Sequence, residues 1–598
     1  MPGDDATPME LPAGPAGGAA RFGSDAVAEA LAALDIPWIA LTPGSSFRGL
    51  HDSLVNHLGS RRPALMICLH EEHAVAIAHG WAKVTGRAMA AAVHANVGLM
   101  HAAMAVFNAC CDCAPVLLIG ATGPVDPEKR RPWIDWVHTA RDQGALVRGY
   151  VKWDDQPASP AAAREAVVRG HWIAEAAPQG PVYVNLDAGL QEAPLAVPLP
   201  PLDLARLAPA LRPGPDPGLV RRAGAALAAA RRPVVLAGRV SRSPEAWQQR
   251  VALAEALGAR VISSLKVAAA FPTDHPLHAG SPAIWPDARA AAALQEADVL
   301  LSLDWVDLAG TLRAAFGLGG PSATVIQASP DHLPASGWSM ESRALAPVDI
   351  LLPVAPDAAV AALLEALGGQ QAEAPRPGGP ADASEPRPSP AFDAAGPLDV
   401  AQLAHALRRA SEGRQVSLTH LPLSWDGAFW PFRHPLDYLG AEGGAGIGSG
   451  PGLTVGAALA LKGGGRLAVG ICGDGDFLMG ATALWTAAHY RLPLLIVVAN
   501  NRSFYNDEVH QERMARQRGR PVENKWIGQR IADPDIDIAG LARAQGAQGF
   551  GPVIEAGDLP AALQAAIAAV DGGGVAVVDV RVTAGYTPAM SAAVGRAE

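Results

Sequence analysis

One stretch in the C-terminal part of the chain constrains both the fold and the chemistry. An apolar run typical of a buried parallel strand, Leu467–Cys472, ends next to Asp474. A segment with helical apolar spacing follows at Met479–Tyr490, and a second apolar run, Leu494–Ala499, leads to Asn501. This order predicts a strand-helix-strand unit, and both of its strands finish at the same edge of a parallel sheet.

The side chains at that edge predict a metal site beside a phosphate. Asp474 and Asn501 should emerge next to each other, and a carboxylate with an amide oxygen is a hard, all-oxygen pair that suits Mg²⁺. Gly473 and Gly475 flank the aspartate and let the backbone approach a phosphate closely. The alternative is a pair of solvated turns on an ordinary α/β unit, and the spacing of the two residues argues against it.

The stretch resembles the cofactor motif of thiamine-diphosphate enzymes, in which a Gly-Asp-Gly is followed by an Asn-Asn. The resemblance implies that the side chains of Asp474 and Asn501 and the backbone carbonyl of Ser503 hold Mg²⁺ against the diphosphate. It also implies that the surrounding residues contact the cofactor, namely Gly473, Gly475, Asp476, Phe504 and Tyr505.

A second strand-to-helix junction supplies the other half of the expected site. His70-Glu71-Glu72-His73 precedes a helical segment, Ala74–Val84. Acidic residues in a first helical turn are favoured by the helix dipole, so neither glutamate requires a function. The segment nevertheless resembles one in thiamine enzymes, in which a glutamate precedes a Gly-aromatic-Ala triplet, here Gly80-Trp81-Ala82. The register of that resemblance selects Glu71.

The chemistry of thiamine diphosphate gives a physical role to Glu71. The reactive thiazolium carbon loses its proton to the cofactor's own aminopyrimidine group. A buried carboxyl group that hydrogen-bonds to the pyrimidine ring nitrogen favours the tautomer that acts as this base. We therefore expect Glu71 to activate the cofactor.

Two residues of the first domain are candidates for contact with the substrate. His94 matches the position where benzoylformate-decarboxylase-like members carry an active-site histidine and acetolactate-synthase-like members a small polar residue. Histidine titrates near neutrality and can relay protons, although a structural histidine at a strand end is the alternative. Ser45, in Pro-Gly-Ser, matches a substrate-facing serine of the decarboxylases, or is a solvated turn serine. His101 stands where both subfamilies usually have asparagine, and its role stays open.

A glycine-rich segment precedes an Ala/Leu-rich helix in the third domain. Within it, Ile447, between Gly446 and Gly448, matches the bulky apolar residue that lies under the cofactor in this family and bends its two rings into a V, and Gly448 is expected to contact the cofactor as well. A core isoleucine is the alternative.

The alternation of strand and helix patterns predicts an α/β protein with three doubly wound parallel-sheet domains. The resemblance orders them as a pyrimidine-binding (PYR), a middle and a diphosphate-binding (PP) domain. The predicted divisions are a disordered N-terminus at 1–20, the PYR domain at 21–190, a connector at 191–217, the middle domain at 218–368, a linker at 369–396 and the PP domain at 397–590. The linker is dense in proline and poor in bulky apolar residues.

The middle domain carries no fingerprint of a dinucleotide. Its strand Pro233–Leu236 is followed by Ala-Gly-Arg-Val, without the Gly-x-Gly-x-x-Gly of nicotinamide sites. The segment Phe271–Gly280 resembles the middle domain of acetolactate synthases, some of which hold FAD. The sequence itself does not support FAD here.

Composition excludes several classes of function. A net charge of −11 argues against a nucleic-acid partner. The acidic, proline-rich N-terminus lacks the features of a signal peptide, and no apolar stretch is long enough for a spanning helix, so we expect a cytoplasmic protein without a membrane partner. Cys110, Cys111 and Cys113 lie close together, and buried small side chains are a better interpretation than metal ligands because no second pair stands at ligand spacing.

The resemblance implies a thiamine-diphosphate- and Mg²⁺-dependent enzyme that cleaves or forms a C–C bond next to a carbonyl. The main expectation is acetolactate-synthase-like decarboxylation of a 2-oxoacid with carboligation. The alternatives are a benzoylformate-decarboxylase-like simple decarboxylase, an aldehyde lyase and a cyclic-diketone hydrolase, and outside this chemistry a nicotinamide oxidoreductase or a non-catalytic binding protein. The small-molecule substrate would be a 2-oxoacid, aldehyde or ketone, bound at subunit interfaces of a homodimer or homotetramer.

Overall fold

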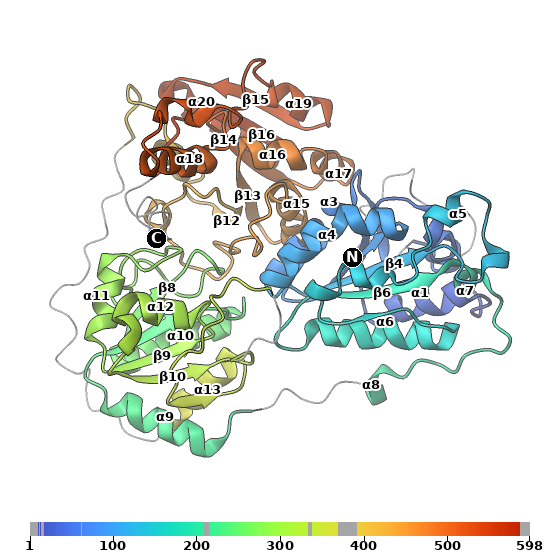
Figure 1. The fold of residues 1–598 in the computed structure, drawn as a ribbon, viewed down its shortest axis with the longest axis horizontal. Helices are drawn as coiled ribbons and strands as arrows, with labels where there is room; N and C mark the ends of the chain where they lie inside the picture. Colours follow the sequence, from blue (N-terminus) through green and yellow to red (C-terminus); the bar gives the residue numbers. More distant parts are fainter. Residues whose placement is uncertain are drawn as a thin grey trace.

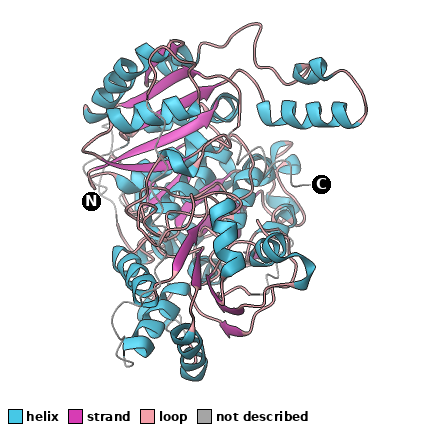
Figure 2. Ribbon diagram, turned by 90° about the vertical axis from the view of Figure 1, so that its left-hand side faces the viewer, coloured by secondary structure: helices cyan, strands magenta, loops and turns pink. Residues whose placement is uncertain are grey.

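The computed structural model describes residues 10, 12–13, 17–60, 62–207, 214–332, 338–368 and 392–586. These residues form three sheets, and all neighbouring strands within each sheet are parallel. Figure 1 shows three bodies, the first in blue to cyan, the second in green and the third in orange to red. In Figure 2 the magenta strands lie between cyan helices. The predicted fold class is confirmed.

The first sheet has the strand order β2-β1-β3-β4-β6-β5. Its strands are β1 (Trp38–Leu41), β2 (Ala64–Ile67), β3 (Met89–Val93), β4 (Val116–Thr122), β5 (Asp154–Asp155) and β6 (Val182–Asp187). The helices are α1 (Gly23–Ala33), α2 (Arg48–Asp52), α3 (Glu71–Thr85), α4 (Ala95–Cys111), α5 (Ile134–Val137), α6 (Pro160–Glu175) and α7 (Ala188–Glu192). Alternate residues of β1 point to opposite faces: Trp38 and Ala40 pack with α3 and α4, while Ile39 and Leu41 pack with α1 and α6.

The middle sheet has the order β11-β10-β9-β7-β8. Its strands are β7 (Pro233–Ala237), β8 (Arg260–Ser263), β9 (Val299–Leu303), β10 (Thr324–Ala328) and β11 (Ile350–Leu352). Its helices are α9 (Pro217–Ala229), α10 (Pro244–Leu257), α11 (Ala288–Glu296), α12 (Leu308–Phe316) and α13 (Pro356–Gly368). The short helix α8 (Leu204–Leu207) lies in the connector, and its Leu204 packs against the core of the first domain.

The third sheet has the order β12-β13-β14-β16-β15. Its strands are β12 (Gln415–His420), β13 (Arg466–Gly473), β14 (Leu494–Asn500), β15 (Gln548–Val553) and β16 (Val575–Arg581). Its helices are α14 (Val400–Ala410), α15 (Gly450–Leu461), α16 (Asp474–Gly480), α17 (Ala483–His489), α18 (Tyr505–Gln517), α19 (Ile538–Ala544) and α20 (Leu559–Asp571).

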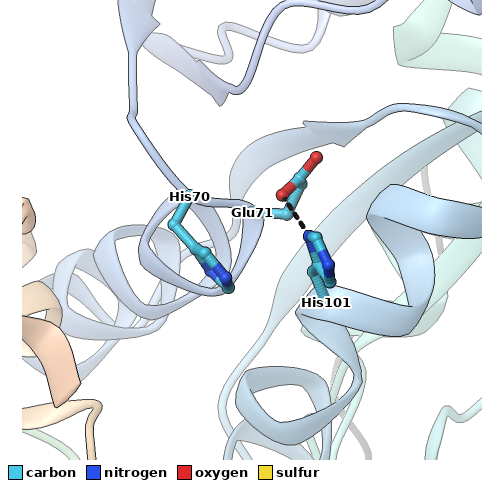
Figure 3. Close-up of side chains that lie close together, drawn as sticks. All are labelled: His70, Glu71 and His101. Carbon is cyan, nitrogen blue, oxygen red and sulfur yellow. Dashed lines mark hydrogen bonds and ion pairs between the residues drawn. The ribbon is translucent and has the colours of Figure 1, made fainter.

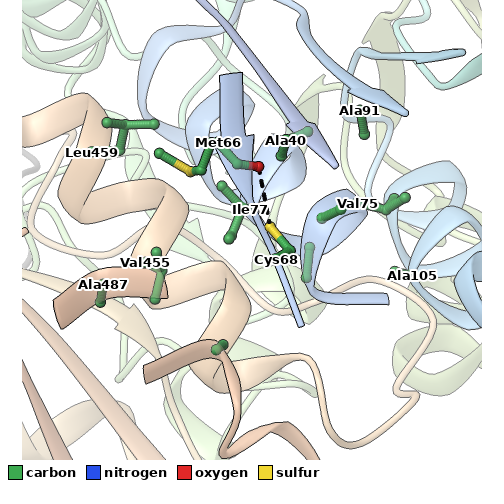
Figure 4. Close-up of a cluster of buried hydrophobic side chains, with 14 of the residues drawn as sticks. Ala40, Met66, Cys68, Val75, Ile77, Ala91, Ala105, Val455, Leu459 and Ala487 are labelled. Atoms are coloured by element: carbon green, nitrogen blue, oxygen red, sulfur yellow. Dashed lines mark hydrogen bonds between the residues drawn. The ribbon is translucent and has the colours of Figure 1, made fainter. Parts of the chain in front are cut away.

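Helices α3 and α15 join the first and third domains through two glycines. A Cβ atom added at Gly80 would lie 2.2 Å from the carbonyl oxygen of Leu453, and one at Gly456 would lie 1.9 Å from that of Ile77. The backbones therefore approach as closely as only glycine permits. Figure 4 shows the core at this contact, where Ile77 belongs to the same buried cluster as Val455 and Leu459. The Gly80-Trp81-Ala82 triplet thus has a packing role.

The structure corrects several expected elements. Helix α16 begins at Asp474 itself, not after a turn, because β13 ends in extended backbone at Gly473, which serves as the N-cap. The sequence favours Ser24 as a helix cap, but Phe22 occupies the N-cap position of α1 without a side-chain capping hydrogen bond, and Ser24 accepts a hydrogen bond from Ser53. The sequence also predicts a loop followed by a helix over residues 95–111, and these residues are helical throughout.

The predicted disordered N-terminus at 1–20 and the linker at 369–396 lie largely outside the described residues, and the predicted domain divisions stay predictions. Among the described helices, none combines the length and the apolar character that crossing a membrane requires.

Candidate active site

The predicted metal ligands lie at the carboxyl end of the third sheet. Asp474 directly follows β13, and Asn501 directly follows β14, which is the neighbouring strand. Burial raises the pKa of Asp474 to about 6, although backbone N–H groups, including those of Ser503 and Arg502, act in the opposite direction. Gly473 at the end of β13 pairs with Ala499 near the end of β14, so the two strand ends meet, as the sequence predicts.

The polar atoms at this edge include an unpaired acceptor. Oδ2 of Asp474 is buried, and no hydrogen-bond partner for it is found among the described residues. Oδ1 of Asn501 accepts a hydrogen bond from the backbone N–H of Ser503 at 2.9 Å, and the Ser503 hydroxyl donates to Glu508 at 2.5 Å. A buried, unpaired carboxylate oxygen beside an amide side chain is a donor set that a hard cation satisfies.

Asp476 fixes the loop that precedes α15. Its Oδ1 accepts hydrogen bonds from the backbone N–H groups of Gly448 at 2.7 Å and Gly450 at 3.3 Å. Its Oδ2 lies 3.1 Å from Nε2 of His420. Burial disfavours the charged form of His420, but attraction to Asp476 and the hydrogen bond to it prevail and raise the pKa of His420 to about 9. The Asp476 carboxylate therefore holds the loop and pairs with a buried imidazolium.

The loop presents an apolar side chain at its surface. Ile447 is 43% exposed in the single chain, so the alternative that it is a core residue is wrong. Gly448 has a φ of +105°, a conformation that glycine adopts without strain. An exposed isoleucine beside the anchored loop is free to contact a bound group.

Gly475 has a steric role that the sequence analysis does not predict. A Cβ atom at this position would lie 2.5 Å from Cε1 of Phe504. The aromatic ring therefore requires glycine here, whether or not a phosphate approaches. The next residue, Tyr505, begins α18 and packs its ring 5.3 Å from that of Tyr586.

The two glutamates at the start of α3 face different neighbours. Glu72 faces the third domain of its own chain, where an added Cβ at Gly448 would lie 3.6 Å from its Oε1. Burial, with a contribution from the negative charge of Asp476, raises the pKa of Glu72 to about 6. Glu71 lies about 100° around the helix and faces α4, where a Cβ at Gly98 would lie 3.0 Å from its Oε1.

Glu71 is in contact with a histidine. Figure 3 shows Nδ1 of His101 directed at Oε2 of Glu71, and the two atoms are 3.1 Å apart. The imidazole of His70 stacks on that of His101 with 5.0 Å between ring centroids and 18° between ring planes. Nδ1 of His70 accepts a hydrogen bond from the backbone N–H of Glu72 and so caps α3. The resulting cluster of His70, Glu71 and His101 is fixed to the start of this helix.

Ser46 determines the orientation of His94. The Ser46 hydroxyl oxygen accepts a hydrogen bond from the backbone N–H of Ala95 at 3.1 Å and lies 2.8 Å from Nδ1 of His94. The backbone N–H of Ser46 also donates to Nδ1 at 3.4 Å, so Nδ1 is an acceptor and the ring proton of a neutral His94 lies on Nε2. Burial, and then the nearby His138, lower the pKa of His94, so the neutral form prevails at pH 7.

Ser45 lies beside His94 and binds an arginine. The preceding Gly44 touches the His94 ring, since an added Cβ would lie 2.4 Å from its Cγ. The Ser45 hydroxyl accepts a hydrogen bond from Arg131 at 3.1 Å. The guanidinium is also paired in a bidentate manner with the buried Asp135, at 2.9 and 3.2 Å. Arg131 therefore orients the serine while its charge is balanced by Asp135.

The site contains contacts that the sequence analysis does not predict. The pairs His101–Glu71, Ser46–His94 and His420–Asp476 each join residues that are distant in the chain. The sequence has histidine at position 101, where the resemblance predicts asparagine. This difference could have indicated the first pair. The sequence contains no signal of the other two.

The fold and the two strand-to-helix junctions define a class. The chain belongs to the thiamine pyrophosphate enzymes. Three family descriptions match in order: the N-terminal TPP binding domain at residues 21–146, the central domain at 220–332 and the C-terminal TPP binding domain at 423–580.

Individual relatives include both decarboxylases and acetolactate synthases. The chain is 28% identical over 498 residues to the benzoylformate decarboxylase of Pseudomonas aeruginosa, which covers 81% of this chain and 85% of that protein. The acetolactate synthase large subunit of Corynebacterium glutamicum is 26% identical over 288 residues, or 47% of this chain and 44% of that protein. The crystal structure of benzoylformate decarboxylase from Polynucleobacter necessarius has the same fold, with a TM-score of 0.77 over 95% of this chain and all of that one, at 22% identity.

The donor sets fit the groups that this family implies. The unpaired Oδ2 of Asp474, with Asn501 and Ser503, suits a Mg²⁺ ion and the phosphate oxygens it would bind. The half-buried loop with Ile447 and the buried Glu71 offer the apolar and carboxyl contacts that thiamine rings require. Among the described residues, these sets lie at strand ends of the first and third sheets.

Proposed function

We propose that this protein is a thiamine-diphosphate- and Mg²⁺-dependent decarboxylase of a 2-oxoacid, with an aryl 2-oxoacid such as benzoylformate as the substrate class. The observation that carries the proposal is the near full-length similarity to a benzoylformate decarboxylase, combined with a histidine at position 94. This favours the simple decarboxylase over the acetolactate synthase expected first, because the similarity to the acetolactate synthase spans only about half of the chain.

The residues of this chain divide the work in the proposal. Asp474, Asn501 and the Ser503 carbonyl hold Mg²⁺ and through it the diphosphate, and Glu71 shares a proton with the pyrimidine nitrogen. When bound, the thiazolium ring supplies the electron sink that loss of CO₂ from a 2-oxoacid requires.

His94 and Ser45 act on the substrate in this proposal. The Nε2–H of a neutral His94 donates a hydrogen bond to the substrate's carbonyl oxygen, and His94 relays from solvent the proton that replaces the lost carboxylate, so that it returns to its neutral form. The Ser45 hydroxyl accepts from Arg131, so its own hydrogen is available to the substrate carboxylate. The products are CO₂ and the aldehyde with one carbon fewer, which balances the reaction without an oxidant.

We further propose that each active site is shared by two chains. Glu72 faces the third domain of its own chain, so Glu71, on another side of α3, is turned away from that domain. Several large apolar side chains, some near Glu71 and others near the metal edge, are exposed in the single chain. They are Leu69, Val97, Met100, Ile447 and Met479. A second chain that covers these side chains would bring Glu71 to the partner's metal edge.

The substrate proposal is tested by product analysis. Purified protein with thiamine diphosphate and Mg²⁺ is incubated separately with benzoylformate, pyruvate and a cyclic diketone, and CO₂ and organic products are quantified. We expect benzaldehyde and CO₂ in equal amounts, with benzoylformate consumed fastest. Faster conversion of pyruvate to acetolactate would restore the acetolactate-synthase alternative, and ring opening of the diketone would establish a hydrolase. The absorption spectrum of the same preparation tests for FAD.

A further inference from the structure

The cluster at the start of α3 contains a histidine that the proposed chemistry does not use. His101 lies on α4, and its Nδ1 is 3.1 Å from Oε2 of Glu71. The Glu71 carboxylate is 11% exposed, whereas the His101 side chain is 60% exposed in the single chain. The exposed side chain of His101 therefore binds the buried Glu71 carboxyl group from the solvent side.

The contact leaves one carboxylate oxygen available. Oε2 is occupied by His101, while Oε1 faces Gly98 on the same helix, α4. Because glycine has no Cβ, and an added one would lie 3.0 Å from Oε1, the space beside this oxygen stays open. His101 thus binds one oxygen of the Glu71 carboxyl group, and the space next to the other oxygen is open.

The His101 ring is itself held in place. His70 stacks on it, and His70 is in turn fixed because its Nδ1 caps the backbone N–H of Glu72 at 3.1 Å. A stacked ring whose neighbour is part of the helix cap has little rotational freedom. The direction of the His101 Nδ1–H bond is therefore set by the same helix that carries Glu71.

We propose that His101 is a positioning residue for Glu71: it donates from Nδ1 to Oε2 and so holds the carboxyl group with Oε1 directed at the pyrimidine nitrogen of the cofactor. The inference rests on the cofactor part of the proposed function and not on the identity of the substrate. An ionised carboxylate accepts only, so the proton in this hydrogen bond belongs to the histidine, which fixes the Nδ1–H tautomer.

The first test needs no cofactor. ¹⁵N NMR of the imidazoles in the cofactor-free protein, assigned with His101→Asn, reports which ring nitrogen of His101 carries the proton. We expect Nδ1–H in the wild type and loss of that tautomer preference in Glu71→Ala. A neutral His101 protonated at Nε2 in the wild type, or a spectrum unchanged by Glu71→Ala, would overturn the hydrogen bond.

The second test measures deuterium exchange at the reactive carbon of bound thiamine diphosphate, which does not depend on any substrate. We expect His101→Ala to slow exchange by about tenfold, with cofactor affinity within about threefold of wild type, because the carboxyl is present but less well oriented. His101→Asn should recover most of the rate, since its amide N–H can donate to Oε2. His51→Ala, which changes an exposed histidine of α2, is the matched control and should exchange like wild type.

A double-mutant cycle decides whether His101 acts through Glu71. In the Glu71→Gln background, His101→Ala should change the exchange rate by less than about twofold, since the carboxyl that it positions is gone. Wild-type exchange in His101→Ala, no recovery in His101→Asn, or an undiminished effect in the Glu71→Gln background would each overturn the proposal. Failure of the substrate panel with these results intact would reject only the substrate class.

Discussion

Two adjacent glutamates at the start of α3 have different neighbours. Glu71 pairs with His101 on α4, while Glu72 is turned toward Asp476 and Gly448 of its own chain. Both residues are glutamates, so the direction in which each side chain projects from α3 determines which groups it contacts.

Glu71→Gln should keep the fold and bind thiamine diphosphate, yet slow deuterium exchange at its reactive carbon by about 10²–10⁴-fold. Glutamine fills the same volume but cannot share a proton with the pyrimidine nitrogen. Glu72→Gln is the matched control and should cost far less. If Glu72→Gln is the slow variant, the activating glutamate has been assigned wrongly.

Asp474→Asn should weaken Mg²⁺-dependent cofactor binding by about 10–100-fold, measured by calorimetry at pH 8. Without metal, the same variant should be more stable than wild type at that pH. The folded-state pKa of Asp474 is raised to about 6, so its contribution to stability is present below its ordinary value of 3.8 and is lost as the pH rises through 6. The gap in Tm between variant and wild type should therefore widen from pH 5 to pH 8. Wild-type Mg²⁺ dependence in the variant would reject the metal assignment.

At the scale of the element, the close contact of α3 with α15 positions the two strand-to-helix junctions. Gly80 and Gly456 make that contact possible, and Asp476 anchors the loop that leads into α15. Two glycines and the hydrogen bonds of the Asp476 carboxylate therefore determine the geometry around the glutamates.

Gly456→Ala should destabilise the protein by about 1–3 kcal/mol or more, because the added methyl would lie 1.9 Å from the carbonyl oxygen of Ile77. Thermal unfolding measures the loss. Gly224→Ala in α9 is the control: its added Cβ meets Ala366 at an ordinary 3.6 Å, so helix propensity should make it neutral or stabilising by up to about 1 kcal/mol. Equal effects of the two substitutions would contradict the tight helix contact.

His420→Gln should destabilise the protein more at pH 7 than at pH 10. The pKa of His420 is raised from 6.5 to about 9, so the stability from its pairing with Asp476 is fully present below pH 6.5 and is lost as the pH rises through 9. The difference in Tm between variant and wild type at the two pH values measures this. A difference that does not change with pH would show that the ion pair contributes nothing.

The elements were predictable where periodicity is strong. The strands predicted at Leu467–Cys472, Leu494–Ala499 and Pro233–Leu236 agree with the structure to within one residue at each end, because a continuous apolar run marks them locally. The start of α16 at Asp474 was not predicted, since it depends on how β13 ends. Of the site, the sequence indicated Asp474 and Asn501 through their spacing and Glu71 through the register of the resemblance. Histidine at position 101 departs from the family pattern and so hinted at its contact, but the contacts of Ser46 and His420 join distant elements, and a single sequence carries no record of them.

At the scale of the whole molecule, three α/β domains place two half-sites on one chain. The first domain carries Glu71 with His94, and the third carries Asp474 with Asn501. Because Glu72 occupies the side of α3 that faces its own third domain, we propose that Glu71 serves the metal edge of a second copy of the chain. The active form would then be at least a dimer, and a larger assembly would repeat this pairing.

The most direct test of this account is complementation between two inactive chains. Differently tagged Glu71→Ala and Asp474→Ala chains are co-expressed, and heterodimers are isolated through both tags and assayed for deuterium exchange at the reactive carbon of thiamine diphosphate. In each heterodimer one site receives both substitutions and the other receives neither, so about half of the wild-type exchange per dimer should return. Heterodimers of Asp474→Ala with Asn501→Ala, whose substitutions lie in the same half-site, should stay inactive. Isolated Glu71→Ala/Asp474→Ala heterodimers without activity would contradict the shared site.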